Sequence, residues 1–209
     1  MWAVPVIHML RSTTLRQLTN MEDNLLTNES ATRKIGTLYL VTSAIIAALY
    51  VVLTLPFAQF AFGPMQFRLS EMMTVLPILT PAAIPGLTLG CFLANLLNPN
   101  NLGPIDIVFG SLATLLAAIC TRYISQHFVR ISQMPRDIIA LIPPVFFNAV
   151  IVGTYLTFLL PHDSSVTLAV IGISILSVGL SEAITVYALG LPFLLVLRRT
   201  HIETIWNKK

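Results

Sequence analysis

The stretch that decides the fold is residues 167–197, TLAVIGISILSVGLSEAITVYALGLPFLLVL. It is apolar for more than thirty residues, and Glu182 is the one charged residue within it. An α-helix needs about 20 apolar residues to cross the hydrocarbon core of a bilayer. The run is continuous and does not alternate as a strand would, so it predicts a membrane-spanning helix with a buried carboxylate.

The composition of the whole chain extends this prediction. Hydrophobic residues make up 56% of the 209 residues and charged residues 10%, and the mean hydropathy is +0.82. A soluble domain carries roughly 25% charged residues, so the sequence predicts an all-α integral membrane protein with a six-transmembrane-helix bundle. The predicted spans are 37–61, 68–83, 85–98, 104–126, 137–160 and 167–197. The second and third are short and bounded by prolines, which is typical of tilted or broken helices.

The placement of lysine and arginine predicts the orientation. With both termini cytoplasmic, eleven of the twelve basic residues lie in cytoplasmic segments or at cytoplasmic helix ends, and Arg68 remains near the outer face. This matches the positive-inside pattern, so the net charge of +3 gives no reason to expect a nucleic-acid partner. The predicted division is a polar N-terminal segment 1–34, a transmembrane domain 35–198 and a basic tail 199–209. Residues 1–20 lack the pattern of a signal peptide, and Met21 is an alternative start.

Motifs for catalysis are missing from the sequence. It has no Walker-type phosphate loop, and its four histidines lack metal-ligand spacing. We therefore expect no catalytic residue, metal or cofactor in this chain.

Three of the nine acidic residues, Glu71, Asp106 and Glu182, lie within or beside long apolar runs. Carboxylates at membrane depth are costly and mark functional sites by default. The candidate substrate-binding residues are these three acids with Arg68, Asn148, Gln66, Asn95, Phe109, Phe147 and Tyr155. Apolar walls with a few placed polar groups suit a small, flat, polar molecule that enters from outside.

Structural alternatives exist for several of these residues. Arg68 and Glu71 are three residues apart and can neutralise each other at a helix end. Asp106 can serve as the N-cap of the fourth helix. The phenylalanines can be packing residues. Glu182 is the hardest to explain structurally, because its own span contains no basic residue.

At these residues the chain resembles the QueT family, the queuosine-precursor substrate-binding (S) components of energy-coupling factor (ECF) transporters. The resemblance covers roughly residues 35–197 and excludes the first thirty. The two most specific blocks are Gln66-Phe67-Arg68-Leu69-Ser70-Glu71 and Asp106-Ile107-Val108-Phe109-Gly110-Ser111-Leu112-Ala113-Thr114. Weaker blocks are 82–87, 90–95, 147–149 and 181–192.

The resemblance implies an S component that binds a 7-deazaguanine precursor and docks onto a transmembrane coupling protein with two ATPases. These partner ATPases would use the ATP and supply the energy. A guanine-like edge offers N–H donors to a carboxylate, and its carbonyl accepts from Arg, Gln or Asn. A cationic 7-aminomethyl group would favour a second carboxylate, and aromatic rings can stack on the base. The sequence leaves open whether the amino, cyano or free-base form is preferred.

The resemblance also implies docking through small residues of the first helix, here Ala44 and Ala48 with Ala47 beside them. Small residues four apart let helices approach closely. Gly86/Gly90 and Ala113/Ala117 have the same spacing and could instead serve internal packing.

Two other functions remain open. One is an S component for another small vitamin-like nutrient. The other is an intramembrane enzyme that uses Glu182 or Asp106 as acid or base.

Overall fold

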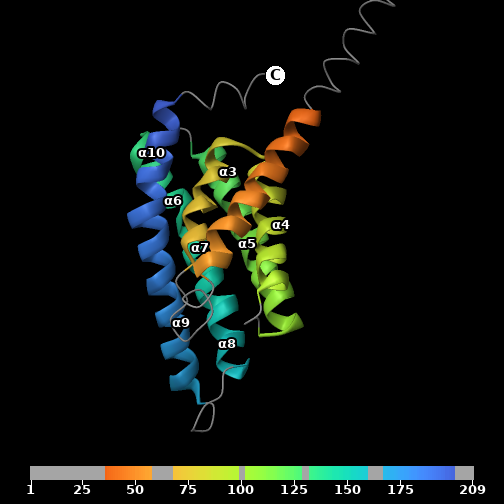
Figure 1. Cartoon of the computed structure of the whole chain (residues 1–209). Helices are drawn as coiled ribbons and strands as arrows, with labels where there is room; N and C mark the ends of the chain where they lie inside the picture. Colours follow the sequence, from red (N-terminus) through yellow and green to blue (C-terminus); the bar gives the residue numbers. More distant parts are fainter. Residues whose placement is uncertain (1–35, 58–67, 99–101, 129–131, 160–166, 201–209) are drawn as a thin grey trace, which may run out of the picture. The chain divides into compact units, whose positions relative to one another are not determined.

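The computed structural model of the chain describes residues 36–57, 68–98, 102–128, 132–159 and 167–200. Packing divides the chain into a unit Met1–Leu40 and a unit Val41–Lys209, and all contacts reported below lie within the second. Every regular element in the described ranges is helical. The prediction of an all-α protein is therefore confirmed (Figure 1).

The first helix, Gly36–Phe57, ends in a short 3₁₀ turn, η1 (Leu55–Phe57). It packs against α4 (Ala83–Leu97) at a close approach that requires glycine. A Cβ atom at Gly90 would lie 2.6 Å from Cβ of Tyr50, and one at Gly86 would lie 2.8 Å from the carbonyl oxygen of Ser43. The Gly86/Gly90 spacing is thus internal packing, as one of the alternatives predicted.

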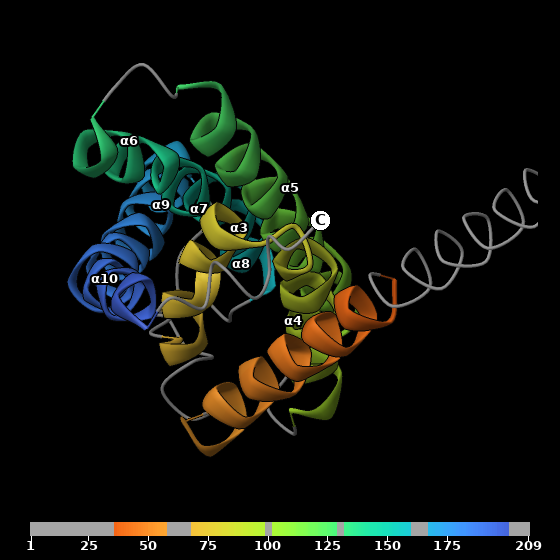
Figure 2. The same cartoon turned by 90° about the horizontal axis from the view of Figure 1, so that it is seen from above.

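Two short elements fill the second predicted span. The 3₁₀ helix η2 (Leu69–Val75) continues directly into α3 (Leu76–Leu79). Thr80 then adopts an extended conformation with φ −142° and ψ 138°, as expected for a residue before proline. The helix consequently ends at Leu79, four residues before the predicted boundary. Figure 2 places η2 and α3 (yellow) between α4 and α10.

The helix α5 (Pro104–His127) is continuous over 24 residues. Its N-cap is Gly103, which has a φ of 95° that only glycine adopts without strain. Pro104 occupies the first turn, where its missing N–H costs no hydrogen bond. The first turn of α5 also holds Asp106.

The two remaining long helices, Gln133–Leu159 and Leu168–Arg199, are each irregular in the middle. The first consists of α6 (Gln133–Ala140), α7 (Ile142–Phe147), the π-helix η3 (Asn148–Val152) and α8 (Gly153–Leu159). The second consists of α9 (Leu168–Ala183), the π-helix η4 (Ile184–Gly190) and α10 (Leu191–Arg199). Pro143, Pro144 and Pro192 lack N–H donors, which accounts for irregular hydrogen bonding next to them. π-segments of this kind are frequent at functional sites.

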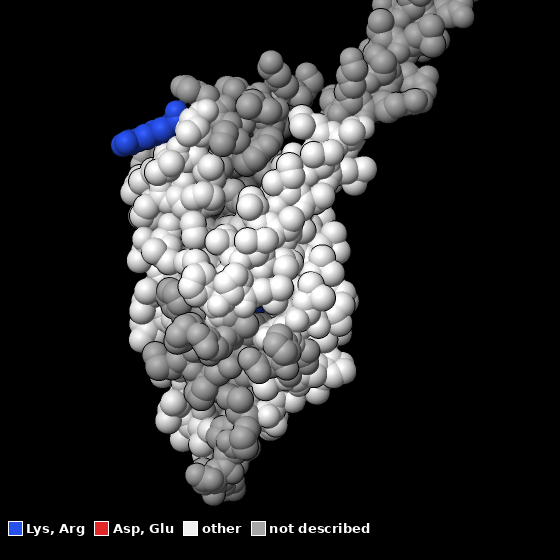
Figure 3. Space-filling view, viewed as in Figure 1, with Lys and Arg blue, Asp and Glu red and all other residues white. Residues whose placement is uncertain are grey.

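Four described helices are long and apolar enough to cross a membrane: Gly36–Phe57, Pro104–His127, Gln133–Leu159 and Leu168–Arg199. Two shorter apolar helices, Leu69–Leu79 and Ala83–Leu97, correspond to the second and third predicted spans. In Figure 3 the visible described surface is almost wholly uncharged, and its most prominent basic atoms (blue, upper left) lie at the end of α10. The protein is thus a helical membrane bundle, while six full crossings and the orientation of the termini remain predictions.

The core joins the first helix, η2, α3 and α4 to η4 and α10 through buried residues such as Tyr50, Val75, Leu87, Val186 and Leu194. At the end of the bundle formed by α6 and α10, Asp137 is fully buried and forms an ion pair with Arg198. Arg122 donates to the carbonyl oxygens of Pro77 and Ile78 at 3.2 Å each and so satisfies the end of α3. These contacts hold the broken second helix and the two irregular helices in fixed positions.

Candidate functional site

Glu182 lies in the last turn of α9, just before η4, and Asn148 begins η3. The Nδ2 atom of Asn148 donates a hydrogen bond of 3.1 Å to Oε1 of Glu182. Both side chains are 6% exposed. The two π-segments therefore bring together the predicted acid of the last span and the predicted amide of the preceding one.

Glu71 is positioned by η2 and by the first helix. Its side chain is 2% exposed, and the hydroxyl of Tyr50 donates to Oε1 at 2.6 Å. One turn along the first helix, the hydroxyl of Thr54 donates to that of Ser70 at 2.6 Å. These two bonds fix the start of η2 against the first helix and hold Glu71 inside the bundle.

Asp106 lies in the first turn of α5 and is fully buried. The hydroxyl of Tyr155, from α8, donates to its Oδ1 at 2.6 Å, and Nη2 of Arg68 lies 3.7 Å from the same oxygen. The prediction that Asp106 serves as an N-cap is wrong: the cap is Gly103, and no side chain makes a capping hydrogen bond there. Arg68, the N-cap residue of η2, forms an ion pair with Asp106 of α5, which neither structural alternative had predicted.

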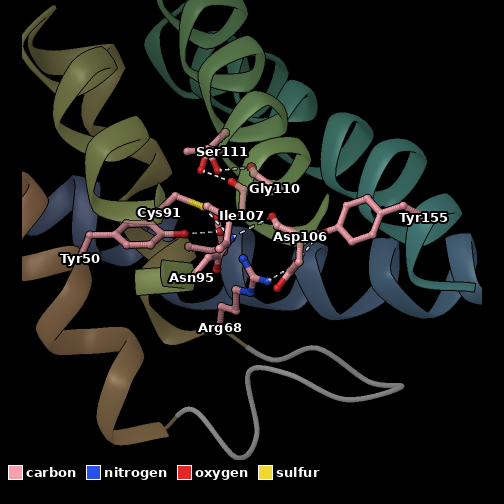
Figure 4. Close-up of polar contacts among 11 residues, drawn as sticks. Tyr50, Arg68, Cys91, Asn95, Asp106, Ile107, Gly110, Ser111 and Tyr155 are labelled. Atoms are coloured by element: carbon pink, nitrogen blue, oxygen red, sulfur yellow. Dashed lines mark hydrogen bonds and ion pairs between the residues drawn. The ribbon is translucent and has the colours of Figure 1, made fainter. Parts of the chain in front are cut away.

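Asn95 supports Asp106 from α4. Its Nδ2 atom donates to the backbone carbonyl of Asp106 at 3.2 Å. A Cβ atom at Gly110 would lie 2.9 Å from that nitrogen, so glycine at this position makes room for the amide. Figure 4 shows Tyr50 and Tyr155 on opposite sides of Arg68 and Asp106, with Asn95 and Cys91 between the helices.

A small cavity lies beside some of these groups. Its volume is about 10 Å³, and it is lined by Arg68, Glu71, Asn148, Val152, Val178 and Glu182. This is about the space that one water molecule needs. A ligand larger than a water molecule would fit there only if the surrounding elements moved apart.

Several buried polar atoms at the site have no hydrogen-bond partner among the described residues. These are Oε2 of Glu71, Oδ1 of Asn95 and Oδ2 of Asp106. Buried polar groups are nearly always paired, and each exception requires an explanation. All three atoms are acceptors that N–H groups of a bound molecule could satisfy, and the guanidinium of Arg68 is a donor at the same site.

The predicted aromatic residues lie mainly outside this cavity. Phe109 and Tyr155 line an apolar groove of about 600 Å³ between α5 and α8, with their ring centroids 6.4 Å apart. Phe109 is 45% exposed in this groove, whereas the hydroxyl of Tyr155 turns inward to Asp106. Phe147 is half-buried and packs near Val152 and Val178, two residues of the cavity wall. Gln66 lies outside the described residues.

Tyr50 and Thr54 were not among the predicted site residues, and the buried acid Asp137 was not predicted to lie at membrane depth. Tyr50 and Thr54 could have been recognised as candidates because they are polar residues within an apolar run. They also lie on the same helix face as Ser43 and Ile46. Asp137 opens the fifth predicted span, where an unpaired carboxylate would have been costly. Within the described ranges, no three His, Cys, Asp or Glu side chains are grouped so that they could hold a metal ion.

The small residues of the first helix fall on two faces. Ala44 and Ala48 are exposed, whereas Ala47 is buried on the face that packs against α4. Ala113 and Ala117 of α5 are buried in the core. Of the predicted docking residues, Ala44 and Ala48 therefore remain accessible to a partner and Ala47 does not.

Comparison with known proteins adds two matches. The family model described as QueT transporter matches residues 40–199. A protein named "Queuosine precursor transporter QueT" from Lactococcus lactis subsp. cremoris is 37% identical over 86 residues, which are 40% of this chain and 49% of that protein. The chain thus spans about half the length of this curated relative. No solved structure matches.

Proposed function

Because the chain belongs to the QueT transporter family, we propose that it is the substrate-capture component of an ECF-type importer that binds a 7-deazaguanine precursor of queuosine. It is a multi-pass membrane protein of a transporter family. To this family assignment the proposal adds three points: the identity of the ligand, its capture from outside the cell, and the way in which transport is coupled to energy. The curated relative carries "queuosine precursor" in its name, which supports this class of ligand.

The observation that carries the proposal is the set of buried polar groups from four parts of the fold: Arg68 and Glu71 at η2, Asp106 in α5, Asn148 in η3, and Glu182 in α9. None of these side chains makes a helix-capping hydrogen bond, although they join elements through the contacts described above. Burying them costs free energy unless they are paired, and function is the explanation for keeping such groups at membrane depth.

Their chemistry matches the edge of a guanine-like base. The unpartnered Oδ2 of Asp106 and Oδ1 of Asn95 can accept hydrogen bonds from ring and amino N–H groups. The guanidinium of Arg68, which is 3.7 Å from Asp106, can donate to the base carbonyl. Phe147 packs against the cluster that contains the cavity-wall residues Val152 and Val178, and it can stack on the ring after the cavity opens.

Transport against a gradient needs an energy source, which we assign to a coupling membrane protein and two ATPases. Ala44 and Ala48 are exposed on the first helix, and small residues at this spacing favour close contact with a partner helix. Arg136, Arg198 and Arg199 lie at the start of α6 and the end of α10. Because Asp137 and Arg198 join these two helix ends, the cations lie at one end of the bundle, which the positive-inside rule would assign to the cytoplasm.

The test is to purify the chain in detergent or nanodiscs and identify what is bound. A capture subunit retains an unmodified 7-deazaguanine at up to one molecule per chain, detected by mass spectrometry after denaturation, and rebinds it in calorimetry. Recovery of a different nutrient would overturn the ligand assignment, and conversion of the added ligand to a product would favour the enzyme alternative. Absence of any binding of 7-deazaguanines would overturn the proposed function.

A further inference from the structure

Carboxylates outnumber cations at the site. Arg68 is the one basic residue among the described residues that line the cavity, which also include Glu71 and Glu182. Its guanidinium lies 3.7 Å from a third carboxylate, that of Asp106. One guanidinium balances one carboxylate, so the buried site has an excess of acidic groups in a medium where unpaired charge is expensive.

Glu71 and Glu182 each have one oxygen engaged. Oε1 of Glu71 accepts from Tyr50 at 2.6 Å, and Oε1 of Glu182 accepts from Asn148 at 3.1 Å. Oε2 of Glu71 is buried and has no hydrogen-bond partner among the described residues. Since both side chains line the same cavity of about 10 Å³, a small cationic group there would contact both carboxylates.

We propose that Glu71 and Glu182 form a subsite for a primary ammonium group on the substrate, with Tyr50 as a positioning residue for Glu71. This inference rests on the proposed function and narrows its ligand to the 7-aminomethyl form. An ammonium group carries three N–H donors and no acceptor, which suits the two carboxylates that line this cavity. A 7-cyano group is neutral and offers only an acceptor, so it would face Oε2 of Glu71 without a hydrogen bond.

Tyr50 reaches the subsite from the first helix and is fully buried. Its hydroxyl donates to Oε1 of Glu71 and thereby leaves Oε2 as the oxygen without a partner. Removal of the hydroxyl frees the carboxylate to rotate toward other donors. We therefore expect Tyr50→Phe to weaken binding of the aminomethyl compound while the neutral compound is little affected.

The experiment measures dissociation constants of 7-aminomethyl-7-deazaguanine and 7-cyano-7-deazaguanine by calorimetry for the full chain in nanodiscs. We expect the wild type to bind the aminomethyl compound at least about 10-fold more tightly, the scale of a charged hydrogen bond. In Glu71→Gln this preference should disappear, with the affinity for the cyano compound within about 3-fold of wild type. Tyr50→Phe should reduce the preference partially.

Tyr187→Phe is the matched control, because Tyr187 donates its hydroxyl to the carbonyl of Ile138, away from the cavity. It should keep the wild-type preference. The wild-type measurement alone decides the inference if a variant fails to fold: equal affinities, or tighter binding of the cyano compound, overturn the ammonium subsite and leave the proposed function intact. An unchanged preference in folded Glu71→Gln overturns the subsite as well. Binding of neither compound overturns both proposals.

Discussion

The hydroxyl of Tyr50 in the first helix lies 2.6 Å from Oε1 of Glu71 in η2. This hydrogen bond links the helix that exposes Ala44 and Ala48 to a carboxylate that lines the cavity. The Cβ and Cγ atoms of the same Tyr50 side chain face Gly90 of α4, where an added Cβ atom would lie 2.6 and 3.0 Å from them. A ligand that draws Glu71 toward itself would therefore change a contact of the first helix, which gives a physical route from ligand binding to the proposed docking face.

Glu182→Gln is expected to weaken binding of the 7-deazaguanine ligand by about 1–3 kcal/mol, the scale of a charge-assisted hydrogen bond. The amide retains the size of the carboxylate but loses its charge at the cavity. Titration calorimetry measures the change. Ser174→Ala is the control on the same helix, because Ser174 bonds to the carbonyl of Gly153 and does not line the cavity. Unchanged affinity in a folded Gln variant would exclude Glu182 from the site.

Arg68 and Asp106 are expected to act as a coupled pair. Asp106→Asn and Arg68→Gln should each reduce ligand affinity and the apparent Tm, because each leaves a buried charge without its partner. In the double variant the losses should be less than additive, with a coupling energy of about 0.5–3 kcal/mol in a double-mutant cycle. Thermal unfolding and calorimetry on the four proteins test this. Strict additivity would show that the two groups act independently.

Gly90→Ala is expected to destabilise the protein by about 1–3 kcal/mol, the usual cost of overpacking. The added Cβ atom would lie 2.6 Å from Cβ of Tyr50 and would force the first helix away from α4. Gly172→Ala is the matched control, since a Cβ atom there has no heavy atom within 4 Å. Its apparent Tm should stay equal or rise slightly. Equal Tm values for Gly90→Ala and wild type would contradict the close packing of these helices.

Ala44→Trp and Ala48→Trp are expected to abolish uptake and assembly with the coupling protein while ligand binding by the isolated chain stays near wild type. Both residues are exposed, and a bulky side chain prevents the close approach that small residues allow. Co-purification with the partner subunits and uptake in cells are the measurements. Leu176→Trp, at a 73% exposed position on α9, is the control for added bulk on the surface.

Two other results would redirect the docking proposal. If both tryptophan variants still assemble and transport, the partner binds another surface. The other two small-residue pairs, Gly86/Gly90 and Ala113/Ala117, are used for packing inside the bundle. The docking surface would therefore not include them. If ligand binding itself is lost, the exposed alanines are coupled to the pocket, and the Tyr50–Glu71 bond is the connection to examine first.

The sequence by itself determined the membrane class, the helical elements and the three acids at membrane depth. These follow from local properties: the length of an apolar run, the position of proline, and the cost of a carboxylate in lipid. The helix α3 ends at Leu79, four residues before the end of the predicted span, because Pro81 forces Thr80 out of the helical conformation. The tertiary structure alone decided which groups meet, since hydrogen-bond partners are set by how helices far apart in sequence pack. Asp106 pairs with Arg68 and Tyr155, Glu71 with Tyr50, and Glu182 with Asn148. The hydrogen-bonded partners are separated by 21 to 49 residues in the sequence. Because no local pattern encodes the rotation of one helix against another, Tyr50 was part of an apolar run in the sequence and became part of the site only in the fold.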